Sequence, residues 1–152
     1  MEINTFKKLN GEGKKIAIVQ AHFNEGITNK MRDGAIKALK ESGVNDKDIE
    51  VFVVPGSVEI PIVCQKVARK KKFDGIITIG TIIKGETAHF DYVAKAITDG
   101  FMRVSLDEGL PITFGVITTY NLEQAQARAK DDENNKGYEA GMALVEVLSL
   151  SV

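Results

Sequence analysis

The sequence predicts an α/β fold with three layers, in which helices cover both faces of a central, mainly parallel sheet of four strands. Four short runs rich in β-branched residues are apolar throughout, which is typical of strands buried on both faces. The segments between these runs repeat apolar residues at helical spacing. Alternating strands and helices favour parallel pairing through crossover connections, so we expect a flavodoxin-like α/β/α sandwich.

The first half of the chain supplies two of these strands. The run "IAIV" at 16–19 is the first. We expect Thr28 to cap the following helix and Gly43 to end it. The apolar face of that helix is formed by Met31, Ala35, Ala38 and Leu39. The second run, "IEVFVVPG" at 49–56, leads into a helix that begins near Glu59, between two prolines.

The second half supplies the other two strands, "GIITIGTII" at 75–83 and "ITFGVITT" at 112–119. The third strand is followed by a helix whose apolar face is Val93, Ile97, Phe101 and Val104. Two helices, at about 121–129 and 136–149, follow the fourth strand. The first residues, "MEINTF" at 1–6, could add a short edge strand or pair with another chain.

Composition limits the classes of partner. The chain has 152 residues, which suits a single domain over 1–152 with one core. Lys and Arg number 20 against 21 Asp and Glu, so charge gives no reason to expect nucleic acid or an anionic membrane. No run is long enough to span a bilayer and none resembles a secretion signal, so we expect a cytoplasmic protein. The single cysteine, Cys64, excludes an internal disulfide, and we expect it to be buried and inert.

Polar and aromatic residues follow every predicted strand. In order, these segments are "AHFNEG", "PGSVEIP", "KGETAHFDYV" and "TTYN". Ligands of open parallel sheets bind beyond the carboxyl ends of the strands, where loops and helix N-termini converge. The sequence therefore predicts a ligand site at this edge.

The third of these segments shares the glycine spacing of a P-loop but not its lysine. Gly80 and Gly85 have the required separation, but Glu86 stands where the lysine should be, which excludes a nucleoside triphosphatase of that kind. A simpler anion site is compatible with the residues, in which the backbone N–H groups of Gly85, Glu86 and Thr87 face the ligand. The alternative is a plain strand-to-helix turn with Thr87 as the N-cap.

Each remaining polar or aromatic candidate has a functional and a structural interpretation. His89 could transfer protons, because histidine has an ordinary pKa of about 6.5, or it could be structural. Glu59 could accept hydrogen bonds from a ligand or only favour a helix N-terminus. Phe23, beside Asn24, could stack on a planar heterocycle or fill a gap in the core. Two histidines and one cysteine at unrelated spacings predict no metal site.

Taken together, the loops resemble the 6,7-dimethyl-8-ribityllumazine synthase family of riboflavin biosynthesis. The resemblance runs over nearly the whole chain, and its longest piece, "GTIIKGETAHFDYV", is specific. The matching pieces are "FN" at 23–24, "PGSVEIP" at 55–61, "GTIIKGETAHFDYV" at 80–93, "PITFGVITT" at 111–119, "LEQAQARA" at 122–129 and "NKGYEA" at 135–140.

The resemblance implies a condensation of 5-amino-6-(D-ribitylamino)uracil with 3,4-dihydroxy-2-butanone 4-phosphate, which releases phosphate and water and needs no metal or organic cofactor. It implies that Phe23 stacks on the pyrimidine and that His89 transfers protons. The other substrate-binding positions that it implies are Asn24, Ser57, Val58, Glu59, Thr81, Ile82, Ile83, Gly85, Glu86, Thr87, Phe114, Arg128 and Lys136. Thr81, Ile82 and Ile83 would act mainly through their backbone.

The resemblance also implies a homo-oligomer. Phe114 and Arg128 match positions that reach the site of the neighbouring subunit, so a ring of five chains is expected, with riboflavin synthase as a further partner. Some relatives close into icosahedral shells and carry a glycine-containing segment between the last two helices. Here that segment, 130–134, reads "KDDEN", with acidic residues in place of the glycines. The ring of five is still expected, but the sequence does not decide whether such rings assemble further into an icosahedral shell.

Two other functions remain compatible with these loops. A flavodoxin-like module that binds a flavin or another heterocycle would explain Phe23 and the anion site but gives His89 and Arg128 no task. An archaeal-type riboflavin synthase would share the fold and dismutate two lumazines. The run "GTIIKGETAHFDYV" favours lumazine synthase over both.

Overall fold

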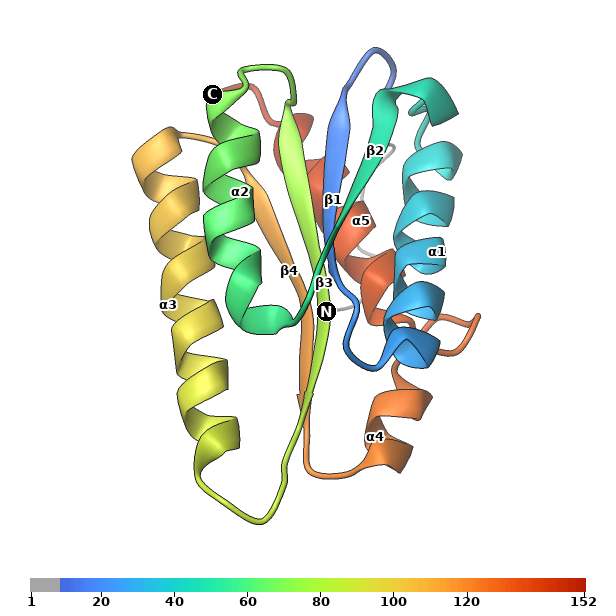
Figure 1. Cartoon of the computed structure of the whole chain (residues 1–152). Helices are drawn as coiled ribbons and strands as arrows, with labels where there is room; N and C mark the ends of the chain where they lie inside the picture. Colours follow the sequence, from blue (N-terminus) through green and yellow to red (C-terminus); the bar gives the residue numbers. More distant parts are fainter. Residues whose placement is uncertain (1–8) are drawn as a thin grey trace.

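The computed structural model describes residues 9–152 and is built on four parallel strands (Figure 1). The strands are β1 (Ile16–Ala21), β2 (Ile49–Val54), β3 (Gly75–Ile83) and β4 (Ile112–Thr119), in the spatial order β2-β1-β3-β4. All neighbouring pairs are parallel, and β3 pairs with β4 along the whole length of β4. The predicted four-stranded sheet is confirmed. The predicted edge strand at 1–6 lies outside the described residues.

Helices cover both faces of the sheet, which confirms the predicted three layers (Figure 1). The helices α1 (Glu25–Glu41), α4 (Leu122–Ala127) and α5 (Lys136–Leu148) lie on one face. The helices α2 (Ile60–Arg69) and α3 (His89–Glu108) lie on the other. Two single turns of 3-10 helix, η2 (Asp46–Asp48) and η3 (Ser57–Glu59), complete the elements. None of the helices within 9–152 is long and apolar enough to cross a membrane.

The sheet separates two apolar cores because neighbouring residues of a strand point to opposite faces. On β1, Ile16 and Ile18 pack toward α1 and α5, whereas Ala17 and Val19 pack toward α2 and α3. The core between the sheet and the helices α2 and α3 also holds Cys64, where burial raises the pKa of the thiol to about 12. The thiol therefore stays protonated at neutral pH, and the predicted buried and inert cysteine is confirmed.

The strand boundaries differ from the predicted ones in the first half of the chain. The third and fourth strands have the predicted limits, 75–83 and 112–119. The first strand continues through Gln20 and Ala21, because the side chain of Gln20 is satisfied by α1: its Nε2 donates to Thr28 Oγ1 at 3.3 Å and to Asn29 Oδ1 at 2.7 Å. The second strand ends at Val54, since the next residue is a proline and lacks an N–H group.

The predicted start of α1 was wrong. Thr28 is not the N-cap: the helix begins at Glu25, and Asn24 occupies the cap position without a side-chain cap bond. Thr28 is fully buried within the first turns, where its hydroxyl meets Gln20. The predicted end is confirmed, because the helix stops at Glu41 and Gly43 adopts φ +96°, a conformation that glycine tolerates.

Close contact between α1 and α5 depends on one buried asparagine and two glycines. Asn135 caps α5 by accepting the Tyr138 N–H at 2.9 Å, and its amide group donates to three backbone carbonyls, those of Lys30, Ala129 and Lys130. A Cβ atom at Gly34 would collide with the Asn135 side chain, and one at Gly137 would collide with the Met31 carbonyl. The two helices therefore approach at a distance that only these small residues permit.

Replacement of Asn135 should destabilise the fold strongly. Asn135→Ala removes the α5 cap and leaves buried carbonyl groups without a donor, so we expect the free energy of unfolding to fall by about 2–4 kcal/mol. Urea denaturation followed by circular dichroism measures this loss. Asn134→Ala is the matched control, because Asn134 is exposed, and it should change stability by less than about 0.5 kcal/mol. Equal losses in the two variants would contradict the role given to Asn135.

Candidate functional site

A cleft of about 640 Å³ opens at the carboxyl edge of the sheet. It lies where the loops after β1, β2 and β3 meet the first turns of α3, at the lower end of the molecule as drawn in Figure 1. The cleft is lined by Phe23, Gly56, Ser57, Val58, Glu59, Thr81, Ile82, Ile83, Gly85, Thr87, His89, Phe90 and Val93. Most of the residues predicted for the site therefore surround one cavity, although they come from distant parts of the sequence.

The wall formed by η3 lies against β3 at Gly80. A Cβ atom there would stand 2.6 Å from Ser57 Oγ, so the Ser57 side chain would have to move if Gly80 were replaced. Within η3, Glu59 Oε2 accepts the Gly56 N–H at 2.9 Å, which orients the carboxylate at the start of α2. This bond uses one oxygen of the half-buried Glu59, which lines the cleft and has further acceptor capacity for hydroxyl donors.

The loop after β1 presents an aromatic ring to the cleft. The His22 and Phe23 N–H groups donate to the carbonyls of Val54 and Pro55, at 2.7 and 3.1 Å, and continue the β1–β2 pairing past the strand ends. The chain then turns at Asn24, whose φ of 61° is left-handed, a conformation that asparagine adopts more readily than most residues. The Phe23 ring is 68% exposed, so it is available to stack on a planar ligand and does not fill the core.

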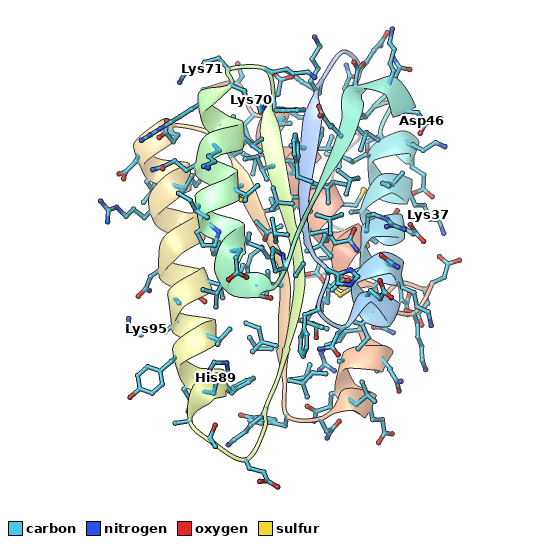
Figure 2. The ribbon with its side chains drawn as sticks, in the orientation of Figure 1. Lys37, Asp46, Lys70, Lys71, His89 and Lys95 are labelled. Carbon is cyan, nitrogen blue, oxygen red and sulfur yellow. The ribbon has the colours of Figure 1, made fainter. Side chains whose placement is uncertain are left out.

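The loop after β3 leads directly into α3, and Figure 2 shows His89 at the start of that helix, where it lines the cleft. His89 is the first residue of α3, and its N–H donates to Thr87 Oγ1 at 3.3 Å. Ala88 holds the N-cap position, one residue after the predicted Thr87, although the Thr87 hydroxyl accepts the N–H group that opens the helix. The segment 85–87 is exposed, which leaves its backbone N–H groups open to an anion.

Several predicted site residues lie outside the cleft. Glu86 is exposed in the β3–α3 loop. Phe114 is on β4, where its ring stacks on that of Phe101 at a centroid distance of 4.7 Å and remains 40% exposed. Arg128 is exposed at the end of α4 and donates to the Gln124 carbonyl at 3.0 Å. Lys136 begins α5 and pairs with Glu139 at 2.8 Å.

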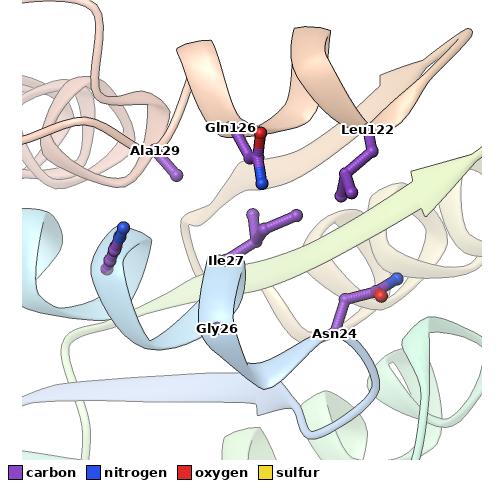
Figure 3. Close-up of a pocket in the computed structure, with 7 residues that line it drawn as sticks. Asn24, Gly26, Ile27, Leu122, Gln126 and Ala129 are labelled. Atoms are coloured by element: carbon purple, nitrogen blue, oxygen red, sulfur yellow. The ribbon is translucent and has the colours of Figure 1, made fainter.

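Asn24 faces a second, smaller pocket of about 330 Å³ between the start of α1 and α4 (Figure 3). That pocket is lined by Asn24, Gly26, Ile27, Lys30, Leu122, Gln126 and Ala129. Adjacent residues of one loop therefore face different cavities, Phe23 the large cleft and Asn24 the small pocket.

Three lining residues were missed by sequence reasoning: Gly56, Phe90 and Val93. A signal for Val93 was present, because it is four residues after His89 and thus on the same face of α3. Phe90 lies in the segment "KGETAHFDYV", directly after His89, so its position beside a candidate residue was a signal as well. Gly56 had no side chain to attract notice, although its N–H group fixes Glu59.

The cleft combines an exposed ring, a fixed carboxylate, free backbone donors and a histidine. These groups can bind a planar polyol-bearing heterocycle and an anion side by side, and can transfer protons between them. Within residues 9–152 there is no group of three or more His, Cys, Asp or Glu side chains that could hold a metal ion.

Comparison with known proteins identifies the family. Residues 13–151 match the family model described as 6,7-dimethyl-8-ribityllumazine synthase, so the chain belongs to this family, whose members are transferase-type enzymes of riboflavin biosynthesis that act on small molecules. A solved structure described as a de novo designed Rossmann fold protein is 15% identical, with 74% of this chain and 90% of that chain covered and a TM-score of 0.43. That likeness is too slight to bear on fold or function.

Proposed function

We propose that this member of the lumazine synthase family condenses 5-amino-6-(D-ribitylamino)uracil with 3,4-dihydroxy-2-butanone 4-phosphate to give 6,7-dimethyl-8-ribityllumazine, phosphate and water. The observation that carries the proposal is the single cleft in which Phe23, Glu59, Gly85, Thr87 and His89 converge. We further propose that the chain acts as one domain in the cytoplasm and needs no metal or organic cofactor, because each step requires only proton transfer and positioning.

The pyrimidine substrate would occupy the half of the cleft between the loops after β1 and β2. The exposed Phe23 ring would stack on the heterocycle, and the backbone of 81–83 would contact its polar edge. The segment 57–59 would follow the ribityl chain, with the Glu59 carboxylate accepting from hydroxyl groups. The bond from Gly56 to Glu59 Oε2 supports this role, since it orients the carboxylate before any ligand arrives.

The phosphate substrate would occupy the half next to α3. The N–H groups of Gly85, Glu86 and Thr87 would donate to its phosphate, helped by the positive end of the α3 dipole. The 5-amino group would attack the ketone and form an imine with loss of water. Removal of a proton from the adjacent carbon would expel phosphate and leave an enol that becomes a new ketone. The ribityl-bearing nitrogen would attack this ketone and close the ring with loss of a second water. Each step needs a proton transfer, which His89 would carry out, and its position in the lining of the cleft supports this role.

The outward positions of Phe114, Arg128 and Lys136 support a site completed by a neighbouring subunit. None of the three lines the cleft of its own chain. We therefore propose that they reach the cleft of an adjacent copy in a homopentamer, where the Arg128 guanidinium would bind phosphate through paired N–H groups. Asn24, which faces the smaller pocket, would contact the pyrimidine substrate from the edge of the large cleft.

Incubation with the two substrates tests the proposed reaction directly. We expect fluorescent 6,7-dimethyl-8-ribityllumazine to appear together with phosphate in equal amounts. Riboflavin formed from added lumazine would support the archaeal-type riboflavin synthase instead, and tight binding of lumazine or flavin without turnover would support a binding module. Phosphate release without lumazine would also contradict the proposal.

His89→Ala should lower turnover while a slow reaction persists. A positioned general acid–base typically contributes about 10²–10⁴-fold, and the remainder comes from holding two substrates together. Steady-state rates of lumazine formation measure the loss. His22→Ala is the matched control, because His22 is exposed, pairs with Glu25 at 3.3 Å and does not line the cleft. An unchanged rate in His89→Ala would remove His89 from the mechanism.

Arg128→Ala should raise KM for the butanone phosphate about tenfold or more and leave KM for the pyrimidine nearly unchanged, since a guanidinium is a bidentate phosphate partner. A mixed assembly tests whether the arginine acts across chains. The two impaired variants, His89→Ala and Arg128→Ala, are mixed in equal amounts and refolded together. If each site takes His89 from one chain and Arg128 from its neighbour, roughly a quarter of the sites should contain both wild-type residues and regain activity. No recovery would indicate that both residues act within one chain.

A further inference from the structure

Among the described residues, Lys84 has no carboxylate partner, and it directly precedes the segment 85–87, the phosphate loop, without lining the cleft itself. It follows the last residue of β3, and its backbone N–H donates to the Thr119 carbonyl at 2.8 Å. Its ammonium group lies 5.7 Å from the centroid of the Tyr120 ring. Throughout 9–152, no Asp or Glu forms an ion pair with Lys84, whereas Lys95 and Lys136 each hold a carboxylate.

Three carboxylates lie on or beside the cleft. Glu86 is in the same loop, Asp91 is in the first turn of α3, and Glu59 lines the opposite wall. A phosphate ester carries a charge of about −1.5 to −2 at neutral pH, so these carboxylates repel it. In the segment "KGETAHFDYV", Lys84 is the single Lys or Arg. Within this segment, Lys84 is therefore the one cationic side chain that could bind a phosphate together with the backbone N–H groups of the loop.

Tyr120 holds this cation near the loop without neutralising it. The Tyr120 N–H donates to Gln124 Oε1 at 2.8 Å, which fixes the residue at the end of β4. An aromatic ring attracts an ammonium group through its quadrupole and carries no net charge. The positive charge of Lys84 thus remains available to an anion, and the weak attraction of an exposed ring lets the flexible side chain turn toward one.

We propose that Lys84 is a further binding residue for the phosphate-bearing substrate, supplied by the same chain as the phosphate loop and stored over the Tyr120 ring. This inference rests on the proposed function and adds a second cation to the Arg128 of the adjacent copy. The Lys84 ammonium group attracts the phosphate substrate before it binds and partly neutralises the phosphate charge once it is bound. Loss of Lys84 should therefore weaken binding of the phosphate substrate and not of the uncharged pyrimidine.

Lys84→Met keeps the length of the side chain and removes its charge. We expect KM for the butanone phosphate to rise about three- to tenfold, with KM for the pyrimidine unchanged and a weaker dependence of the phosphate KM on salt, since one screened charge is gone. Lys84→Arg should retain the low KM. Lys70→Met is the matched control, because it changes net charge equally at the end of the molecule opposite His89 (Figure 2).

The ring is tested by two substitutions at one position. Tyr120→Phe keeps a face for the ammonium group and should leave the phosphate KM unchanged, whereas Tyr120→Leu should raise it. Equal KM values and equal salt dependence in Lys84→Met and Lys70→Met would overturn the inference.

Binding of inorganic phosphate separates this inference from the proposed reaction. In a calorimetric titration, Lys84→Met should bind inorganic phosphate more weakly than Lys70→Met, whether or not the wild-type protein forms lumazine. Equal affinities would overturn the role of Lys84 and leave the proposed reaction standing. Absence of lumazine from the wild-type protein, with the affinity difference present, would overturn the reaction and leave the phosphate-binding lysine.

Discussion

The parallel direction of all four strands is the constraint on which the site depends. A parallel strand pair cannot be joined by a tight turn, so each strand must be followed by a helix or loop that returns across a face of the sheet. Every strand then ends at the same edge. Residues as distant in sequence as Phe23 and His89 meet there because the sheet, and not any local contact between them, sets their positions.

The loops at this edge contribute different parts of the site. The loops that lead into α2 and α3 bring the carboxylate and the backbone donors of the large cleft, whereas the Phe23 ring comes from the loop that leads into α1 on the other face. The β4–α4 connection leaves toward the other face and carries Arg128 outward. One chain therefore presents a cleft on one side and exposed groups on another, a pattern suited to copies that complete each other's sites.

Sequence patterns located the fold where burial alone decides the structure. The limits of β3 were correct because the strand is buried almost throughout, and those of β4 were correct although Phe114 and Thr118 on that strand are exposed. The end of β1 was missed because Gln20 looks like a loop residue until Thr28 and Asn29 are seen to satisfy it. For the same reason Thr28 was mistaken for a cap. Such errors arise from tertiary hydrogen bonds between polar side chains, which the spacing of apolar residues in the sequence does not predict.

The contact between α1 and α5 has a consequence for the order of folding. The Asn135 amide reaches the Lys30 carbonyl across 105 positions of sequence, and Gly137 fits against Met31. Loop closure over such a separation is slow compared with local helix formation. During synthesis, β1 and β3 can cover part of the apolar face of α1, but the part that packs on α5 stays exposed to water until α5 emerges, so the nascent chain passes through a stage with exposed apolar surface.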